Sequence, residues 1–206
     1  MLLWLGLALI VLGAAAFAVD RPVAHFFYEH ANSGFRRFCQ RTTDLAKGGH
    51  WLVVACVAFL IAQGALAFKI CEPAAHVIAT YSLAFLASLA AGSAVLHALK
   101  IIMGRRRPRD EFEHSLYGFK FFTFDTQYDS FPSGHALTIF CVASVACCAW
   151  PLLAVLWLAL ALWLALTRMF LTSHFLSDIL IGAGVGVLAS REVIVNIFPA
   201  LAPGWL

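Results

Sequence analysis

Two groups of residues, one at the end of a predicted helix and one at the start of another, suit an anionic ligand. Six residues separate Lys100 from Arg107, a spacing of about two helical turns, so both side chains are expected to point the same way from one helix end. Pro108 then disfavours further helix. The second group, Ser133-Gly134-His135, lies where another helix is predicted to begin, and free backbone N–H groups there favour a phosphate. Taken alone, these groups are also typical of a surface anchor and a helix cap.

A third group places a histidine beside a carboxylate. His174 and Asp178 are four residues apart, so they are predicted to share one face of a helix, where the carboxylate can accept a hydrogen bond from one ring nitrogen. The other ring nitrogen is then unprotonated and can act as a nucleophile or a base. An acid within an apolar stretch is costly in a bilayer unless it is paired, which indicates a function for Asp178.

Together the three groups supply what an in-line phosphoryl transfer requires. Lys100, Arg107 and Arg168 give three cations against the roughly two negative charges of a phosphate monoester. Such a transfer also needs a nucleophile and a proton donor, and two histidines, His135 and His174, are available. The sequence has no carboxylate pair or histidine cluster with the spacing of a metal site. We therefore expect neither a metal ion nor another cofactor.

The elements that position these groups are predicted to be membrane-spanning helices. The 206 residues are 62% hydrophobic and 12% charged, with a mean hydropathy of +0.87. This composition excludes a soluble globule, a disordered chain and a nucleic-acid-binding protein. A crossing helix needs about 20 apolar residues, and Pro151 must break one apolar run that is too long for a single crossing. The six expected spans are Leu2–Val19, Trp51–Phe68, Val77–Leu99, Phe131–Ala149, Leu152–Leu171 and Ser173–Ser190.

We therefore predict an all-α, multi-pass transmembrane bundle of about six helices with its active site at one membrane face. The crossings bring the end of the third span, the start of the fourth, the end of the fifth and the start of the sixth to that face. Residues 1–50 are expected to form the first transmembrane helix and an interfacial connector of one or two helices, and residues 51–206 a five-helix core that carries the chemistry. A signal peptide is an alternative for the first run, but no Lys or Arg precedes it, which favours a retained helix.

Two further sets of residues are given structural interpretations. The glycines of the sixth span occur at alternate positions without a preceding strand, which indicates close helix packing rather than a nucleotide-binding loop. They are Gly182, Gly184 and Gly186. The remaining arginines near Lys100 are interpreted as surface anchors. They are Arg105, Arg106 and Arg109.

The three groups, in this order, resemble the signature of the type 2 phosphatidic acid phosphatase (PAP2) and haloperoxidase superfamily. That signature has Lys, six residues and Arg-Pro, then Pro-Ser-Gly-His, then Ser-Arg, five residues, His, three residues and Asp. The first two groups match it throughout, and in the third Thr167 replaces the Ser before Arg168 and keeps the hydroxyl. The similarity covers roughly residues 75–190.

The resemblance implies a metal-independent, membrane-embedded lipid phosphatase that works through a phosphohistidine. By this resemblance His174 attacks phosphorus, Asp178 orients it, and His135 protonates the leaving oxygen. The expected substrate is a lipid phosphate or diphosphate, such as phosphatidic acid, phosphatidylglycerophosphate, a polyprenyl diphosphate or a lipid A type phosphate. The residues expected to hold the phosphoryl oxygens are Lys100, Arg107, Ser133, Gly134 through its amide, and Arg168.

Two alternatives stay open. A lipid phosphotransferase would pass the phosphoryl group to an alcohol, and a non-catalytic membrane protein would bind anionic lipids. The expected partners are the bilayer and a lipid phosphate, with no nucleic acid, and the sequence leaves the oligomeric state open.

The orientation in the cell membrane carries a conflict. Of the 14 Lys and Arg residues, all except Lys69 and Arg191 fall on the motif-bearing side, which the positive-inside rule would make cytoplasmic. The resemblance implies an extracytoplasmic active site. We favour the extracytoplasmic side, because a phosphate site imposes its own cations.

Overall fold

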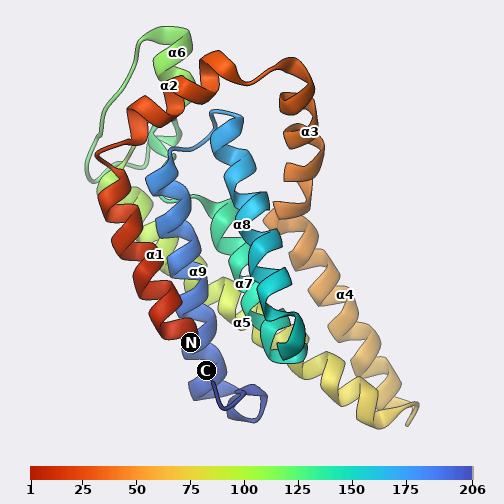
Figure 1. Ribbon diagram of the computed structural model, residues 1–206. Helices are drawn as coiled ribbons and strands as arrows, with labels where there is room; N and C mark the ends of the chain where they lie inside the picture. The colour runs from red at the N-terminus through yellow and green to blue at the C-terminus, as the bar shows by residue number, and fades with distance from the viewer. Residues whose placement is uncertain (206) are drawn as a thin grey trace.

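The computed structural model describes residues 1–205, and within this range the secondary structure is helical, without β-strands. The long helices α1, α4, α5, α7, α8 and α9 form an elongated bundle, while α2 and α6 lie across or above one end of it (Figure 1). The α-helices are α1 (Leu2–Ala16), α2 (Asp20–His30), α3 (Ser33–Thr43), α4 (Gly48–Ala67), α5 (Glu72–Met103), α6 (Pro108–His114), α7 (Gly134–Ala149), α8 (Ala154–Phe170) and α9 (Leu176–Ile197).

The predicted spans correspond to α1, α4, α5, α7, α8 and α9, so the all-α, multi-pass prediction is confirmed. Three helical units are long and apolar enough to cross a membrane by themselves, namely Ser33–Ala67, Glu72–Met103 and Pro151–Phe170. The first helix meets this criterion only together with α2, from which it is bent by 81°. Because α7 is apolar but has only 16 residues, the number of six crossings is approximate.

The connector after α1 contains two helices of different direction. The 81° bend turns α2 away from the axis of α1. In contrast, α3, a short 3-10 turn and α4 together form one helical unit of 35 residues. Only α2 therefore has the sideways course expected of an interfacial helix, whereas α3 extends α4 (Figure 1).

Glycines on α9 set how closely α1 and α7 approach it, as the sequence predicted. A Cβ atom at Gly182 would lie 2.4 Å from the carbonyl oxygen of Ser133, and one at Gly186 would lie 2.5 Å from that of Leu137. Gly184 faces the other way, against α1. This close approach fixes the start of α7, which carries Ser133, against the first turns of α9.

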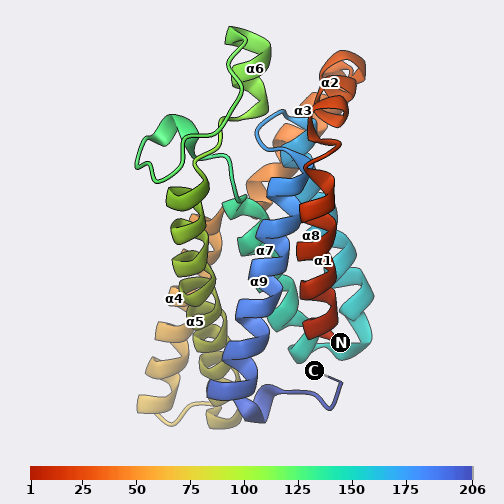
Figure 2. The ribbon, with the colours of Figure 1, turned by 90° about the vertical axis from the view of Figure 1, so that its left-hand side faces the viewer.

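Short connections bring the motif-bearing helix ends together. α7 ends at Ala149, and Pro151 begins a 3-10 turn before α8, so the chain reverses where the proline predicted. Five residues, 171–175, then join α8 to α9. As a result the end of α5, the start of α7, the end of α8 and the start of α9 lie at one end of the bundle, and the two termini lie at the other (Figure 2).

The substitution Gly182→Ala should weaken the junction between α7 and α9. The added Cβ would lie 2.4 Å from the Ser133 carbonyl oxygen, and relieving such an overlap costs about 1–3 kcal/mol. We expect a lower apparent melting temperature of the purified protein in detergent, measured by thermal-shift fluorescence. Gly64→Ala on α4 is the control, because nothing lies within 4 Å of its Cβ position. Equal melting temperatures for the two variants would contradict the packing role of Gly182.

Candidate active site

Lys100 and Arg107 meet at Asp129, although they do not project from one helix. The helix α5 ends just before Gly104, whose φ of +38° suits glycine, and a Cβ there would lie 2.1 Å from the carbonyl oxygen of Lys120. The prediction of a shared helix end is therefore wrong. The side chains converge nonetheless, because the Lys100 ammonium donates to the main-chain carbonyl of Asp129, and Arg107 Nε and Nη2 donate to its carboxylate at 2.9 and 3.0 Å.

Asp129 places a carboxylate among the cations that follow the end of α5, and its position in the sequence did not predict this. Partial burial raises the pKa of its carboxyl, but hydrogen bonds from Arg107 and the charges of Arg107 and Lys100 outweigh this effect and leave the pKa below its ordinary value. A phosphate that approaches Arg107 therefore meets a guanidinium already paired with a carboxylate.

The start of α7 has the features of an anion site that the sequence predicted. Ser133 is the N-cap residue, and its own amide donates to the main-chain carbonyl of Asp178 at 2.9 Å. Gly134 is the first helical residue, and nothing lies within 4 Å of its Cβ position. The helix thus presents the positive end of its dipole with open space at Gly134, while the amide of Ala136 donates to the Ser133 hydroxyl.

Arg168 near the end of α8 is a cation without an ion-pair partner in the described part of the chain. Its Nη1 is 3.5 Å from the hydroxyl of Thr43, and its Nε is buried without a hydrogen-bond partner. The charge of Arg168 interacts with the imidazoles of His135 and His174 and with Arg107. The carboxylate of Asp44 acts on this guanidinium only from beyond ion-pair distance, and a half-buried guanidinium without a direct ion pair is a good receptor for an anion.

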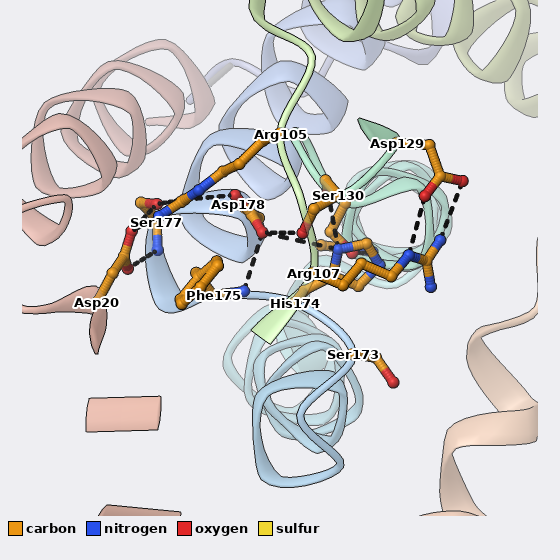
Figure 3. Close-up of polar contacts among 12 residues, drawn as sticks. Asp20, Arg105, Arg107, Asp129, Ser130, Ser173, His174, Phe175, Ser177 and Asp178 are labelled. Carbon is orange, nitrogen blue, oxygen red and sulfur yellow. Dashed lines mark hydrogen bonds and ion pairs between the residues drawn. The ribbon is translucent and has the colours of Figure 1, made fainter. Parts of the chain in front are cut away.

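His174 lies in the loop before α9, not on the same helix as Asp178, and this corrects the predicted arrangement. Its Nδ1 is 2.8 Å from the main-chain oxygen of Ser130 and 3.8 Å from Oδ2 of Asp178. Because a carbonyl can only accept, the hydrogen-bond network assigns the proton to Nδ1 and leaves a lone pair on Nε2. The predicted state of the ring is therefore provided by Ser130 rather than by a direct bond to Asp178 (Figure 3).

Asp178 is completely buried and is held from several sides. Its Oδ2 accepts hydrogen bonds from the hydroxyl of Ser130 at 2.6 Å and from the amide of Phe175 at 2.9 Å. Its Oδ1 accepts from Arg105 Nη1 at 2.8 Å. Ser130 therefore connects the two candidate catalytic groups. Its main-chain carbonyl accepts a hydrogen bond from Nδ1 of His174, and its hydroxyl donates one to Asp178 (Figure 3).

Arg105 is buried at 0% exposure, so its interpretation as a surface anchor is wrong. The loop after α5 turns its guanidinium inward, where Nη1 reaches Asp178 and Nη2 reaches Asp20, each at 2.8 Å. The guanidinium also lies over the ring of Phe175, 4.0 Å from its centroid. Arg109, in contrast, is about half exposed, as a surface anchor requires.

Several polar residues around this cluster escaped the sequence analysis. For Asp20 the sequence does hold a signal, because this acid directly follows the first apolar run and a carboxylate at the edge of a membrane span needs a partner. The others had no such signal, because their contacts join segments far apart in the chain. The missed residues are Asp20, Arg105, Asp129, Ser130 and Ser177.

A profile of the PAP2 superfamily matches residues 81–200, the range that carries all three groups of residues. The chain belongs to the PAP2 superfamily. A lipid A 1-phosphatase of Rhizobium etli is 28% identical over 142 residues, which are 66% of this chain and 60% of that protein. A lipid A 1-phosphatase of Rhizobium johnstonii is 32% identical over 88 residues, which are 43% of this chain and 36% of that protein. The matched region of this PAP2 protein thus spans less than two thirds of either relative.

Two crystal structures share the fold of this PAP2 protein at 16% sequence identity. One is Aquifex aeolicus LpxE, with a TM-score of 0.60 over 86% of this chain and 96% of that chain. The other is a transmembrane PAP2 type phosphatidylglycerolphosphate phosphatase from Bacillus subtilis, with a TM-score of 0.64 over 100% and 98%. The predicted family and its helical membrane fold are therefore confirmed.

Anion binding should depend on Arg168. Replacement by Gln keeps much of the side-chain shape but removes a cation whose Nε is buried and unpartnered in the described structure. We expect Arg168→Gln to weaken the binding of orthovanadate to the detergent-solubilised protein by about tenfold or more, measured by calorimetry. Arg37→Gln, at an exposed position of α3, should bind as the unmodified protein does. Equal affinities of the two variants would remove Arg168 from the anion site.

Proposed function

We propose that this protein hydrolyses the phosphate or diphosphate group of a membrane lipid through a phosphohistidine on His174. The observation that supports this most strongly is the arrangement of His174, with Nε2 free, among cations at one end of a membrane bundle. The charges of Arg107 and Arg168 both act on its ring, and the open start of α7 supplies amides. Membership of the PAP2 superfamily agrees with this chemistry.

In the first step, Nε2 of His174 attacks phosphorus and the bond from phosphorus to the lipid oxygen breaks. Protonated His135 gives its proton to the leaving oxygen, so that the lipid departs as an alcohol or, from a diphosphate, as a monophosphate. The His174 ring becomes positively charged while Nδ1 keeps its hydrogen bond to the carbonyl of Ser130. Neutral His135 then takes a proton from water, whose oxygen attacks phosphorus and breaks the P–N bond, releasing inorganic phosphate.

The cations and amides would carry the charge that spreads over the phosphoryl oxygens during both steps. In this proposal three cationic side chains neutralise the phosphoryl group, so we expect no metal ion to take part. Asp129 occupies Nε and Nη2 of Arg107, so the phosphoryl group would bind the remaining N–H donors of the guanidinium or displace the carboxylate. The residues proposed to hold the phosphoryl oxygens are Lys100, Arg107, Ser133, Gly134 and Arg168.

The candidate substrates belong to a few classes of lipid phosphate, which differ in their head groups. Because both sequence relatives are lipid A 1-phosphatases, a lipid A type phosphate is the first substrate to test. Phosphatidic acid, phosphatidylglycerophosphate and a polyprenyl diphosphate complete the panel. A lipid alcohol added as acceptor separates hydrolysis from phosphoryl transfer, since transfer yields a new lipid phosphate in place of inorganic phosphate.

Substitution of His174 by Ala should abolish turnover, because it removes the proposed nucleophile and leaves in the site only His135, whose proposed role is proton transfer. We expect release of phosphate from the best lipid of the panel to fall by about a thousandfold or more. The control is His76→Ala, at an exposed position near the opposite end of the bundle, which should keep full activity. Assays contain EDTA, so a requirement for a divalent ion would contradict the metal-free mechanism. Unchanged turnover in His174→Ala would overturn the phosphohistidine.

We also propose that the site lies on the extracytoplasmic face of the cell membrane. Four of the positive charges there, on Lys100, Arg105, Arg107 and Arg168, belong to the site or to its buried network, and we weigh the family resemblance above the charges that remain. Aromatic side chains in the loop between α6 and α7 fit a position at the bilayer interface. They are Phe121, Phe122 and Phe124, with exposures of 59, 76 and 85%.

This orientation predicts that both chain ends are cytoplasmic. The termini lie together at the end of the bundle opposite the site, where the amino group of Met1 donates to the carbonyl of Trp205 at 2.6 Å. A green fluorescent protein fused to the C terminus should therefore fluoresce, and a periplasmic alkaline phosphatase fused there should be inactive. Active alkaline phosphatase with a dark fluorescent fusion would place the site on the cytoplasmic face.

A further inference from the structure

Asp20 is a buried carboxylate that the proposed chemistry does not use. It begins α2, directly after the bend that follows α1, and only 1% of its surface is exposed. Its Oδ1 accepts from the amide of Ser177 at 2.9 Å, and its Oδ2 accepts from the hydroxyl of Ser177 and from Arg105 Nη2 at 2.8 Å. The residue lies outside the region matched to the PAP2 superfamily, residues 81–200.

Two carboxylates share the single guanidinium of Arg105. Its Nη2 donates to Asp20, and its Nη1 donates to Asp178 and to the hydroxyl of Ser177, each at 2.8 Å. All three charged side chains are fully buried. With both carboxylates ionised, the cluster has a net charge of −1. Burying such an unbalanced charge is costly unless a positive charge arises beside it.

A positive charge of this kind arises on His174 in the proposed reaction. Its Nδ1 is 3.8 Å from Oδ2 of Asp178, and attack by Nε2 on phosphorus makes the ring cationic. We propose, on the basis of the proposed function, that Asp20 and Arg105 are positioning residues for this step. Arg105 holds Asp178 in place by an ion pair. Its positive charge would cancel the negative charge of Asp178, and the second carboxylate, Asp20, keeps the net charge of the cluster negative. The start of α2 then supports the active site through Asp20.

The substitution Asp20→Asn tests this role, because it keeps the shape of the side chain and removes its charge. Orthovanadate bonded to Nε2 makes the His174 ring cationic, whereas inorganic phosphate bound without such a bond does not. We therefore expect kcat to fall by about tenfold or more with little change in KM. The inhibition constant for orthovanadate should rise by a similar factor, while that for inorganic phosphate is unchanged or lower.

The ratio of these two inhibition constants separates positioning from a merely structural tether. A tether would lower the yield of folded protein, but the ratio depends only on the molecules that are active. Glu29→Gln removes an exposed carboxylate from the same helix and should leave kcat and the ratio as they are. An active Asp20→Asn variant with an unchanged ratio would overturn the inference.

A double-mutant cycle with Arg105→Gln provides a second test. Asp20 reaches Asp178 through Arg105, so Asp20→Asn should have little further effect on the ratio in an Arg105→Gln background. Fully additive effects would overturn the inference. An unmodified protein that releases no phosphate from any lipid phosphate would instead overturn the proposed function, so the two failures are distinguishable.

Discussion

A charged side chain that is withdrawn from water must find opposite charge or hydrogen bonds within a few ångströms. In this protein the constraint is met by Arg105, which lies between Asp20 and Asp178 with both ion pairs at 2.8 Å. The arrangement ties the bend after α1, the loop after α5 and the first turn of α9 to one point. Asp178 can therefore remain a buried carboxylate beside His174.

The other parts of the site follow from how helix ends are joined. Gly182 lets the start of α7 approach α9 so closely that the amide of Ser133 bonds to the carbonyl of Asp178. The main-chain carbonyl of Ser130, just before that start, accepts a hydrogen bond from Nδ1 of His174. The geometry of the candidate nucleophile thus depends on main-chain contacts between segments, which fixed helix packing can hold more firmly than flexible side chains can.

The sequence predicted the parts of this arrangement that depend on apolar length and local spacing. Uncharged runs located the helices, Pro151 located the reversal, and Ser133 located the start of α7. It failed where a long-range contact decides a side chain's position. Arg105 looks like any other arginine at a helix end until the loop after α5 turns it inward. His174 was placed on a helix because the four-residue spacing to Asp178 fits one, but helix α9 begins only after it.

A structure of the protein with a bound phosphate analogue is the most direct test of the central claim, that these helix ends form one phosphoryl-transfer site. With orthovanadate, the account predicts vanadium bonded to Nε2 of His174, with its oxygens contacting Lys100, Arg107, Arg168 and the start of α7. Vanadate bound elsewhere, or a His174 whose Nε2 faces away from these cations, would contradict it.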